Sequence, residues 1–421
     1  MPAAAQGPSA LTSDIERRAN AVNDSVVAWR RDIHAHPELS GQETRTAALV
    51  ADHLRKLGIE VRTGVGGTGV VGVLRGGRPG PVVALRADMD ALPVTEEVDV
   101  PFRSTVRAQY NGQDVGVMHA CGHDTHTAML LGAANVLAGM RDRLPGTVVF
   151  LFQPAEESLG GAAGMIKDGA LENPKPSAVF GLHVFPYTVG SVVYRSGALM
   201  AAGGTLRIVV HGRQTHGAMP WNGVDPVVVA SQIVLGLQTI VSRQTDLTAS
   251  PAIVTVATIN GGVRNNIIPD SVVMTGTIRT FDETQRQQLP ALVRRTAESI
   301  AAASGATATV EAEVAGTITY NDPALVERMR PTVERVVGTG IAGAKVLPGP
   351  QTTTSEDFSL YQKHVPGIFM FLGVTPEAID PKTAAPNHSP KFYVDERALP
   401  IGVKLLSELA VDYLQGARAT P

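Results

Sequence analysis

Short, continuously apolar runs rich in valine constrain the fold of this chain more than any other feature of its sequence. Four of them lie in the first half of the chain: GVVGVLRG, PVVALRA, TVVFLFQ and SAVFGLHV. Runs this short and this uniformly apolar are typical of strands that are buried on both faces. A segment with a strong helical pattern, THTAMLLGAANVLAGM, separates two of them. Because strands that alternate with helices form βαβ units, the sequence predicts an α/β fold with a mostly parallel sheet.

The pattern changes near Gly197. From there the predicted order is strand, helix, strand, strand, helix, strand, which is the split βαβ arrangement of a ferredoxin-like α+β domain. The first pattern then resumes with the strand PGIFMFLGV and a last helix, ERALPIGVKLLSELAVDYLQGA. We therefore expect a discontinuous first domain of residues 1–196 and 316–421, and an inserted domain of residues 197–315.

Composition excludes several classes of protein. The 421 residues are 44% hydrophobic and 18% charged, which suits a globular chain with two or more domains. A net charge of -3 without a basic patch argues against nucleic-acid binding, and no apolar stretch approaches the ~20 residues of a membrane span. The N-terminus lacks the basic start and apolar middle of a signal peptide, and one cysteine permits no internal disulfide. We therefore expect a cytoplasmic protein without nucleic-acid or membrane partners.

Residues that bind metals follow three of the apolar runs. Asp88 and Asp90 follow the second run, Glu156 and Glu157 follow the third, and His183 ends the fourth. Because the carboxyl ends of parallel strands meet at one edge of a sheet, these side chains are expected at a common rim. The motif ACGHD, which holds the single cysteine, opens a helix that should begin at the same rim, and the late loop AAPNHSP offers one more histidine.

Taken alone, each of these residues has an ordinary structural explanation, such as a turn aspartate, a solvated glutamate or a buried thiol. Their combination favours a metal centre. Mixed sulfur, nitrogen and oxygen donors suit a borderline divalent ion such as Zn or Mn, and five ligands exceed one tetrahedral shell, so two ions are expected. Of two adjacent glutamates, one can bind metal while the other acts as a base beside a metal-activated water. The candidates are Cys121, His123, the pair Glu156 and Glu157, His183 and His388.

A cysteine nucleophile is the main alternative for Cys121. Such a nucleophile needs a histidine base that a third group orients, and His123 is close in sequence. This interpretation leaves Glu157, His183 and His388 without a role, whereas the metal interpretation uses all of them. A buried thiol without chemical function is the third interpretation.

Nine stretches match, in order, the motifs of a known family and span nearly the whole chain. On these motifs the chain resembles the dinuclear metallopeptidases that include aminoacylases and glutamate carboxypeptidases. Within them it is most similar to the amidohydrolase branch that contains hippurate hydrolase and the plant auxin-conjugate hydrolases. The stretches are RRDIHAHPELSGQE, ALRADMDALPVTE, MHACGHDTHTAMLLGAA, VVFLFQPAEES, GLHVFPYTVG, GRQTHGAMPWNGVDPV, NNIIPDSVVMTGTIRT, SEDFS and NHSPKFYVDE.

The resemblance implies roles for the residues of the predicted rim. Glu156 becomes the general base, and the five metal ligands become Cys121, His123, Glu157, His183 and His388.

The wider family marks its first metal site with His-x-Asp, and here that motif reads Asp88-Met89-Asp90. The resemblance implies that Cys121 and His123 take over the role of the missing ligand. Both aspartates are placed behind the ligands, with Asp90 counted among the catalytic residues, and Asp124 is assigned either to orienting His123 or to capping its helix.

For the inserted domain, the resemblance implies a lid that also carries the dimer contact. His216 in THGAMP would stabilise the oxyanion and contact substrate in the neighbouring subunit. Asn266 and Arg279 would hold the substrate's carboxylate, which an arginine can bind as a fork. Without the resemblance, these three residues would be ordinary members of a surface strand and loop.

The implied reaction is hydrolysis of the amide bond in N-acyl or N-aroyl amino acids of the hippurate type. The enzyme would be a homodimer or higher homo-oligomer with two divalent ions in each subunit, Mn or Zn with Co or Ni as alternatives. One alternative is a dipeptidase or carboxypeptidase of the same family. A second alternative, a non-catalytic metal-binding dimer, would keep the ligands and lose the base, but Glu156 is present.

Overall fold

The computed structural model describes residues 10–158 and 160–416, and it divides into two compact units. The first unit comprises Met1–Gly197, Tyr320–Pro350 and Asp357–Pro421, and the second comprises Ala198–Thr319 and Gln351–Glu356. The first nine residues, on which the signal-peptide prediction partly depends, lie outside the described residues, so the cytoplasmic location stays a prediction.

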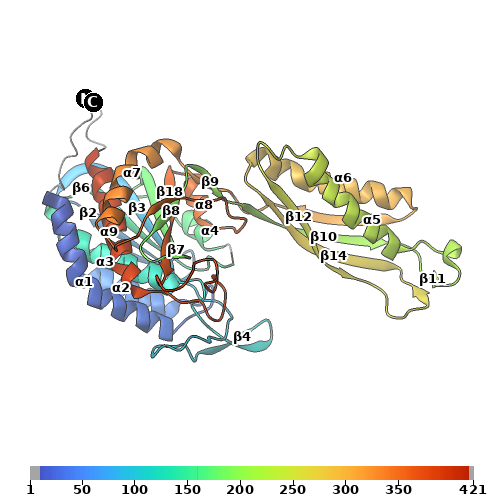
Figure 1. Ribbon diagram of the computed structural model, residues 1–421, viewed down its shortest axis with the longest axis horizontal. Helices are drawn as coiled ribbons and strands as arrows, with labels where there is room; N and C mark the ends of the chain where they lie inside the picture. The colour runs from blue at the N-terminus through green and yellow to red at the C-terminus, as the bar shows by residue number, and fades with distance from the viewer. Residues whose placement is uncertain (1–9, 159, 417–421) are drawn as a thin grey trace. The chain divides into compact units, whose positions relative to one another are not determined.

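An eight-stranded mixed sheet forms the centre of the first unit (Figure 1). Its four central strands, β6, β3, β7 and β18, run parallel to one another, which confirms the predicted α/β class. The run GVVGVLRG, however, forms β2, which pairs antiparallel with β6 and with β1. A uniformly apolar run indicates burial on both faces but carries no information about strand direction. In spatial order the strands are β1 (Glu60–Val65), β2 (Gly69–Arg75), β6 (Pro145–Gln153), β3 (Arg78–Asp88), β7 (Ala178–Thr188), β18 (Gly367–Thr375), β8 (Val192–Tyr194) and β17 (Val346–Pro348).

Helices cover both faces of this sheet, which explains why its central strands are apolar throughout. Every residue of β18 is buried. The larger layer packs its apolar side chains into the main core and consists of α1 (Ala10–Ala35), α2 (Thr44–Lys56), α3 (His123–Ala138), α7 (Pro323–Gly338) and α9 (Leu399–Gly416). The opposite face carries α4 (Gly161–Lys167) and α8 (Phe358–Gln362). Shorter elements of the unit are the hairpin of β4 (Arg107–Tyr110) and β5 (Gln113–Gly116), and the 3-10 turns Arg141–Arg143 and Glu396–Ala398.

The second unit has the element order β-α-β-β-α-β, with two helices packed on one face of a four-stranded antiparallel sheet (Figure 1). Asp225 caps the first helix by accepting hydrogen bonds from two backbone N–H groups, and Pro226 occupies its first position. The main elements are β10 (Ala202–His211), α5 (Pro226–Thr239), β12 (Ala252–Asn260), β14 (Ser271–Thr280), α6 (Glu283–Ala303) and β15 (Thr307–Glu313). A two-stranded antiparallel ribbon of β11 (Thr215–His216) and β13 (Ile267–Ile268) extends it, and a 3-10 turn at Pro220–Asn222 follows β11 in the chain. The strands β9 (Gly197–Met200) and β16 (Thr319–Asn321) lie where the chain passes between the units.

Helix α5 continues into a π-helical turn, Ile240–Gln244, and the two together form one apolar helix of 19 residues, Pro226–Gln244. By length and composition alone this helix could cross a membrane, so the expectation that no apolar stretch approaches a membrane span is wrong here. Its buried side packs on the sheet of the second unit and on α6. Its other side exposes Val227, Val228 and Leu235, and only 33% of its most apolar window is buried.

Candidate metal centre

The register of the parallel strands brings the predicted rim residues of the first unit to one level. Asp88, the last residue of β3, lies opposite Gln153, the last residue of β6. On the other side of β3, Arg86 lies opposite Gly181, so His183 stands two residues further along β7, level with Asp88. Residues distant in sequence therefore meet at one edge of the sheet.

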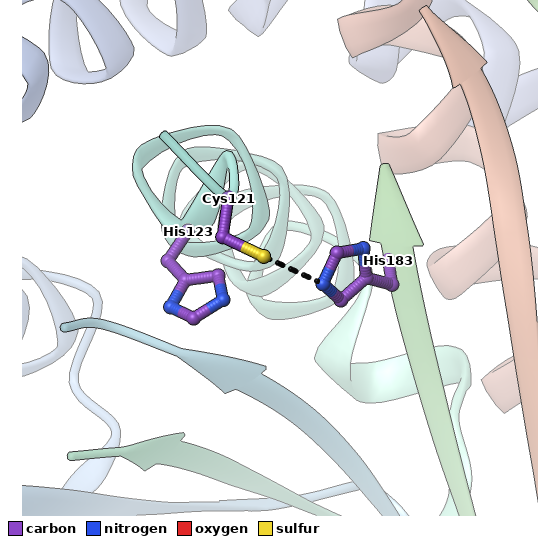
Figure 2. A group of neighbouring side chains, drawn as sticks. All are labelled: Cys121, His123 and His183. Atoms are coloured by element: carbon purple, nitrogen blue, oxygen red, sulfur yellow. Dashed lines mark hydrogen bonds between the residues drawn. The ribbon is translucent and has the colours of Figure 1, made fainter. Parts of the chain in front are cut away.

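The N-terminus of α3 brings the sulfur donor to the same edge. Gly122 adopts a left-handed backbone with φ of 87°, and a Cβ atom there would lie 2.3 Å from the Val184 side chain. Only glycine fits this position without strain. The turn directs Cys121 and His123 toward His183 of β7, and the Cys121 Sγ lies 3.4 Å from His183 Nε2 (Figure 2).

Four overlapping groups of possible ligand atoms lie at this edge, and within each group the atoms lie within 4.8 Å of one another. Together the groups contain all five predicted ligands and Glu156. Cys121 belongs to two of the groups, so its sulfur is placed between them. The groups are Cys121–His123–His183, Cys121–Glu157–His388, His123–Glu156–Glu157 and Asp88–His123–His126.

Hydrogen bonds fix which nitrogen of each histidine faces the centre. His183 donates from Nδ1 to the Val184 carbonyl at 2.7 Å, which leaves the Nε2 lone pair directed at Cys121. His123 donates from Nδ1 to Asp90 at 3.2 Å, and its Nε2 is buried without a hydrogen-bond partner. The Glu157 Oε1 atom is likewise buried without one. Buried ligand atoms that converge in this way without hydrogen-bond partners fit a bound metal ion, which would take the place of a proton on His123 Nε2.

The charge of the donor set also favours a bound metal ion. Burial alone would lower the pKa of His123, but Asp88, Asp90 and Glu157 outweigh it and raise that pKa to about 10. Burial, together with the nearby carboxylate of Glu157, raises the pKa of the Cys121 thiol well above its usual range. A dication would offset this excess of negative charge and would stabilise the thiolate.

The same facts argue against a cysteine nucleophile. A nucleophilic thiol needs a lowered pKa and some exposure, whereas Cys121 is 7% exposed and its pKa is raised. The nearest base is His183, but burial holds the pKa of its imidazole well below the usual value. The proton is therefore held on sulfur, and transfer to the imidazole is unfavourable.

The two aspartates predicted to lie behind the ligands contact ligand residues or their neighbours. Asp90 is nearly fully buried and accepts bonds from His123, from the Ser40 hydroxyl at 2.6 Å and from the Glu157 backbone N–H at 3.0 Å. Asp88 pairs with Arg86 at 2.7 Å. Both carboxylates therefore act through other residues.

His126 is a residue that the sequence interpretation missed. It donates from Nδ1 to Asp88 at 2.5 Å, and its Nε2 accepts the backbone N–H of Val184 at 2.7 Å. Both ring nitrogens are thus occupied, so His126 positions the strand that carries His183 and has no lone pair for a metal. His126 lies three residues, about one helical turn, after His123, and this spacing is the sequence signal that could have identified it.

Asp124 has neither of its predicted roles. Its helix is capped at Gly122 without a side-chain bond, and the carboxylate pairs with Arg30 and with His34, each at 2.8 Å. Burial opposes this charge, but Arg30 and His34 hold the pKa of Asp124 well below its usual range. The residue therefore anchors α3 to α1.

His388 lies in a loop outside the sheet and is the most exposed predicted ligand, with 55% of its side chain accessible. Its Nε2 lies 3.2 Å from Glu157 Oε1, and its backbone has a positive φ of 70°. The loop is held by the His388 N–H, which donates to the Ala120 carbonyl, and by Asn387, which donates to the carbonyls of Cys121 and Val184.

The predicted substrate-binding residues of the second unit lie at two separate positions. His216 and Asn266 are neighbours at the β11–β13 ribbon, where the Gly217 N–H donates to the Asn266 carbonyl. Arg279 lies near the far end of β14, eight positions beyond Ser271, and its guanidinium donates to the Ser355 hydroxyl at 2.5 Å. At strand spacing, eight positions span about 26 Å. One chain therefore does not bring Asn266 and Arg279 to the same carboxylate.

Comparisons with known proteins cover nearly the whole chain. The model of peptidase family M20/M25/M40 matches residues 84–412. Thermostable carboxypeptidase 2 of Saccharolobus solfataricus is 40% identical over 408 residues, 96% of this chain and 99% of that protein. IAA-amino acid hydrolase ILR1-like 2 of Arabidopsis thaliana is 40% identical over 403 residues, 94% and 86% of the two chains. The crystal structure of the Bacillus subtilis YXEP protein, a dinuclear metal-binding peptidase, matches with a TM-score of 0.79 and 36% identity, covering 94% and 99%.

Proposed function

Because the chain belongs to peptidase family M20/M25/M40, we propose that it is an amidohydrolase that cleaves N-acyl and N-aroyl amino acids. The family predicted from the motifs is confirmed by this match, and the chain is a hydrolase. The observation that carries the proposal is the convergence of the orphaned His123 Nε2 and Glu157 Oε1 with a thiol and a second carboxylate.

We assign five residues to holding two divalent ions, with Mn or Zn preferred for this mixed donor set and Co or Ni as alternatives. Cys121 belongs to two of the donor groups, so it is central to this assignment. Bound ions supply Lewis acidity, which activates water and polarises the amide carbonyl. The ligands are Cys121, His123, Glu157, His183 and His388.

Glu156 is proposed as the general base. It lies within 4.8 Å of donor atoms of His123 and Glu157, is 6% exposed and is not needed to complete the five ligands. In this role its carboxylate accepts the proton of the attacking water and then donates it to the leaving amine. Asp90 accepts the His123 Nδ1–H and the Glu157 backbone N–H, so it would keep His123 Nε2 available to an ion and would hold the backbone that carries Glu157.

We further propose that the active form is a dimer. His216, with Asn266 beside it, would reach the neighbouring subunit's site, and Arg279 lies too far along β14 to bind the same carboxylate as Asn266 of its own chain, so both carboxylate contacts would meet at one substrate only in a pair of chains. Two surfaces of the second unit suit a second copy: the exposed apolar side of α5, and β12, the outer strand of the sheet, which exposes Ile253 and Ile259.

Hydrolysis rates over a panel of substrates test the reaction. N-acetyl and N-benzoyl amino acids would be compared with free dipeptides, each with Mn, Zn, Co and Ni, and with chelated protein as the control. We expect N-acyl amino acids to be cleaved fastest and the chelated protein to be inactive. Faster cleavage of free dipeptides or longer peptides would instead support the carboxypeptidase alternative, which the name of the archaeal relative favours.

A further inference from the structure

The residue that precedes the proposed base has an unusual backbone. Ala155 adopts a positive φ of 52°, one of only four such non-glycine residues in the described part of the chain. This left-handed conformation is unfavourable for alanine, so surrounding contacts must hold it in place. Because Glu156 and Glu157 follow directly, the conformation of Ala155 sets the direction in which both carboxylates leave the backbone.

Two buried carboxylates clamp the backbone on either side of Glu156. The Ala155 N–H donates to Glu43 Oε1 at 2.9 Å, and the Glu157 N–H donates to Asp90 Oδ2 at 3.0 Å. Both carboxylates are tied to one short segment, residues 40–43, because Ser40 donates to Asp90. This segment is the SGQE of the first matched stretch, to which neither the metal centre nor the proposed reaction assigns a role.

Glu43 stands at the N-cap position of α2, but its side chain makes no cap hydrogen bond. The helix is instead capped by Glu38, which accepts hydrogen bonds from the N–H groups of Arg45 and Thr46. Glu43 instead accepts bonds from Gly41, from Ala155 and from the Thr68 hydroxyl.

Glu43 is fully buried. Burying a carboxylate is costly unless it is hydrogen-bonded. The three hydrogen bonds to Glu43 offset this cost and hold its carboxylate where it accepts the Ala155 N–H. We therefore propose that Glu43 is a positioning residue for the proposed reaction. It holds Ala155 in its left-handed conformation and so directs Glu157 to the metal and Glu156 to the water. The proposal rests on the function proposed above, but its effect on metal binding does not depend on the substrate.

Three variants test the proposal. Glu43→Ala leaves the Ala155 N–H buried without an acceptor, so the backbone relaxes and both glutamates move. We expect kcat to fall and the metal dissociation constant to rise, each by about 10–100-fold, while KM changes less than about threefold. Glu43→Gln keeps an oxygen for Ala155 and an amide for the Thr68 hydroxyl, so it should recover most of both quantities. Glu43→Asp keeps the charge but shortens the reach and should behave like Glu43→Ala.

Glu38→Ala is the matched control. It removes a half-buried carboxylate from the loop that precedes this segment, and with it the cap of α2, because the side-chain hydrogen bonds of Glu38 go to Thr44, Arg45 and Thr46. This variant should melt at a lower temperature while the metal dissociation constant and kcat stay within about twofold of the wild type.

The result that overturns the proposal is a Glu43→Ala or Glu43→Asp protein that melts earlier, as Glu38→Ala does, yet binds metal and turns over as the wild type does. If Glu43→Ala does not fold, the soluble Glu43→Asp and Glu43→Gln proteins carry the comparison. Failure of the wild type to cleave any N-acyl amino acid would count against the proposed substrate, but the metal dissociation constants would still decide the role of Glu43.

Discussion

The metal centre of the first unit and the predicted substrate residues of the second unit differ in how completely one chain builds them. In the metal centre, His123 and His183 each have one ring nitrogen fixed by a hydrogen bond and the other directed at the centre. In the second unit, the His216 side chain is exposed and its Nδ1 accepts a hydrogen bond from the nearby Ala218 N–H, and Asn266 lies about a strand's length from Arg279.

This difference indicates two kinds of site. A site whose donors are buried and oriented beforehand can bind its ions in a single chain, since little reorganisation is needed. Residues that are exposed and distant from one another become a site only when another surface completes them. The contrast to be tested is therefore between a self-sufficient metal centre and a substrate site shared by two chains.

Replacing the proposed base should give the largest effect. Glu156→Gln keeps the shape of the side chain but removes its basicity, so kcat should fall by about 10²–10⁴-fold. Because Glu156 is not assigned as a ligand, the bound metal measured by atomic absorption should stay the same. Near-normal turnover in the metal-loaded variant would contradict the role of Glu156. As a comparison, Glu157→Gln should lose metal first and regain part of its activity at high metal concentration.

Mixing two inactive proteins tests the shared site. His216→Ala should lower kcat by about 10²-fold or more if this histidine donates to the oxyanion. When subunits of His216→Ala and Glu156→Gln exchange, one site of each mixed dimer carries both substitutions and the other carries none. Activity should then return toward half of the wild-type value for each mixed dimer. With exchange verified by mass spectrometry, an absence of recovery would show that His216 serves its own chain.

The pH dependence of metal binding tests the donor set of the first unit. Without metal, the pKa of His123 is raised to about 10 and that of Cys121 well above its usual range, so both hold protons at neutral pH. Binding must release these protons, so affinity should rise with pH, by about tenfold per pH unit for each proton released. Cys121→Ser should remove about one proton from this slope in a competition titration. A flat profile in the wild type would contradict the assignment of both residues as ligands.

Much of the metal centre could be predicted because its chemistry is local in sequence. Strand ends are recognisable from apolar runs, and parallel strands bring their ends to one edge, so Glu157 and His183 could be expected together without a structure. The structure adds what depends on side-chain geometry. No pattern in the sequence shows that His126 uses both ring nitrogens, or that Asp124 pairs with Arg30 of α1.

The sequence was least informative where the outcome depends on direction or on a partner chain. The apolar run of β2 gave no sign that it pairs antiparallel with β6, since both directions bury the same side chains. The apolar side of α5 resembles a membrane-spanning helix in composition, because an apolar surface that contacts another protein has the same residues as one that contacts lipid. The exposure of Val228 and Leu235 becomes visible only when the helix is packed on its sheet.

The smallest expected effect concerns Arg279, the predicted carboxylate-binding residue at the far end of β14. Burial lowers the pKa of its guanidinium, which is half-buried and donates to Ser355. Arg279→Lys keeps the positive charge but removes the planar fork, so one of two hydrogen bonds to the substrate carboxylate should be lost. We expect KM to rise by about five- to tenfold, which corresponds to roughly one hydrogen bond, with kcat within about twofold.

The matched control is Arg207→Lys, a substitution of an exposed arginine on β10 that pairs with Glu311, and it should leave both constants unchanged. A substrate whose carboxylate is converted to an amide should be cleaved equally poorly by the wild type and by Arg279→Lys, because neither can then form the fork. If the amide still distinguishes the two proteins, Arg279 acts on something other than the carboxylate, and the contrast between a complete metal centre and a divided substrate site would rest on His216 and Asn266 alone.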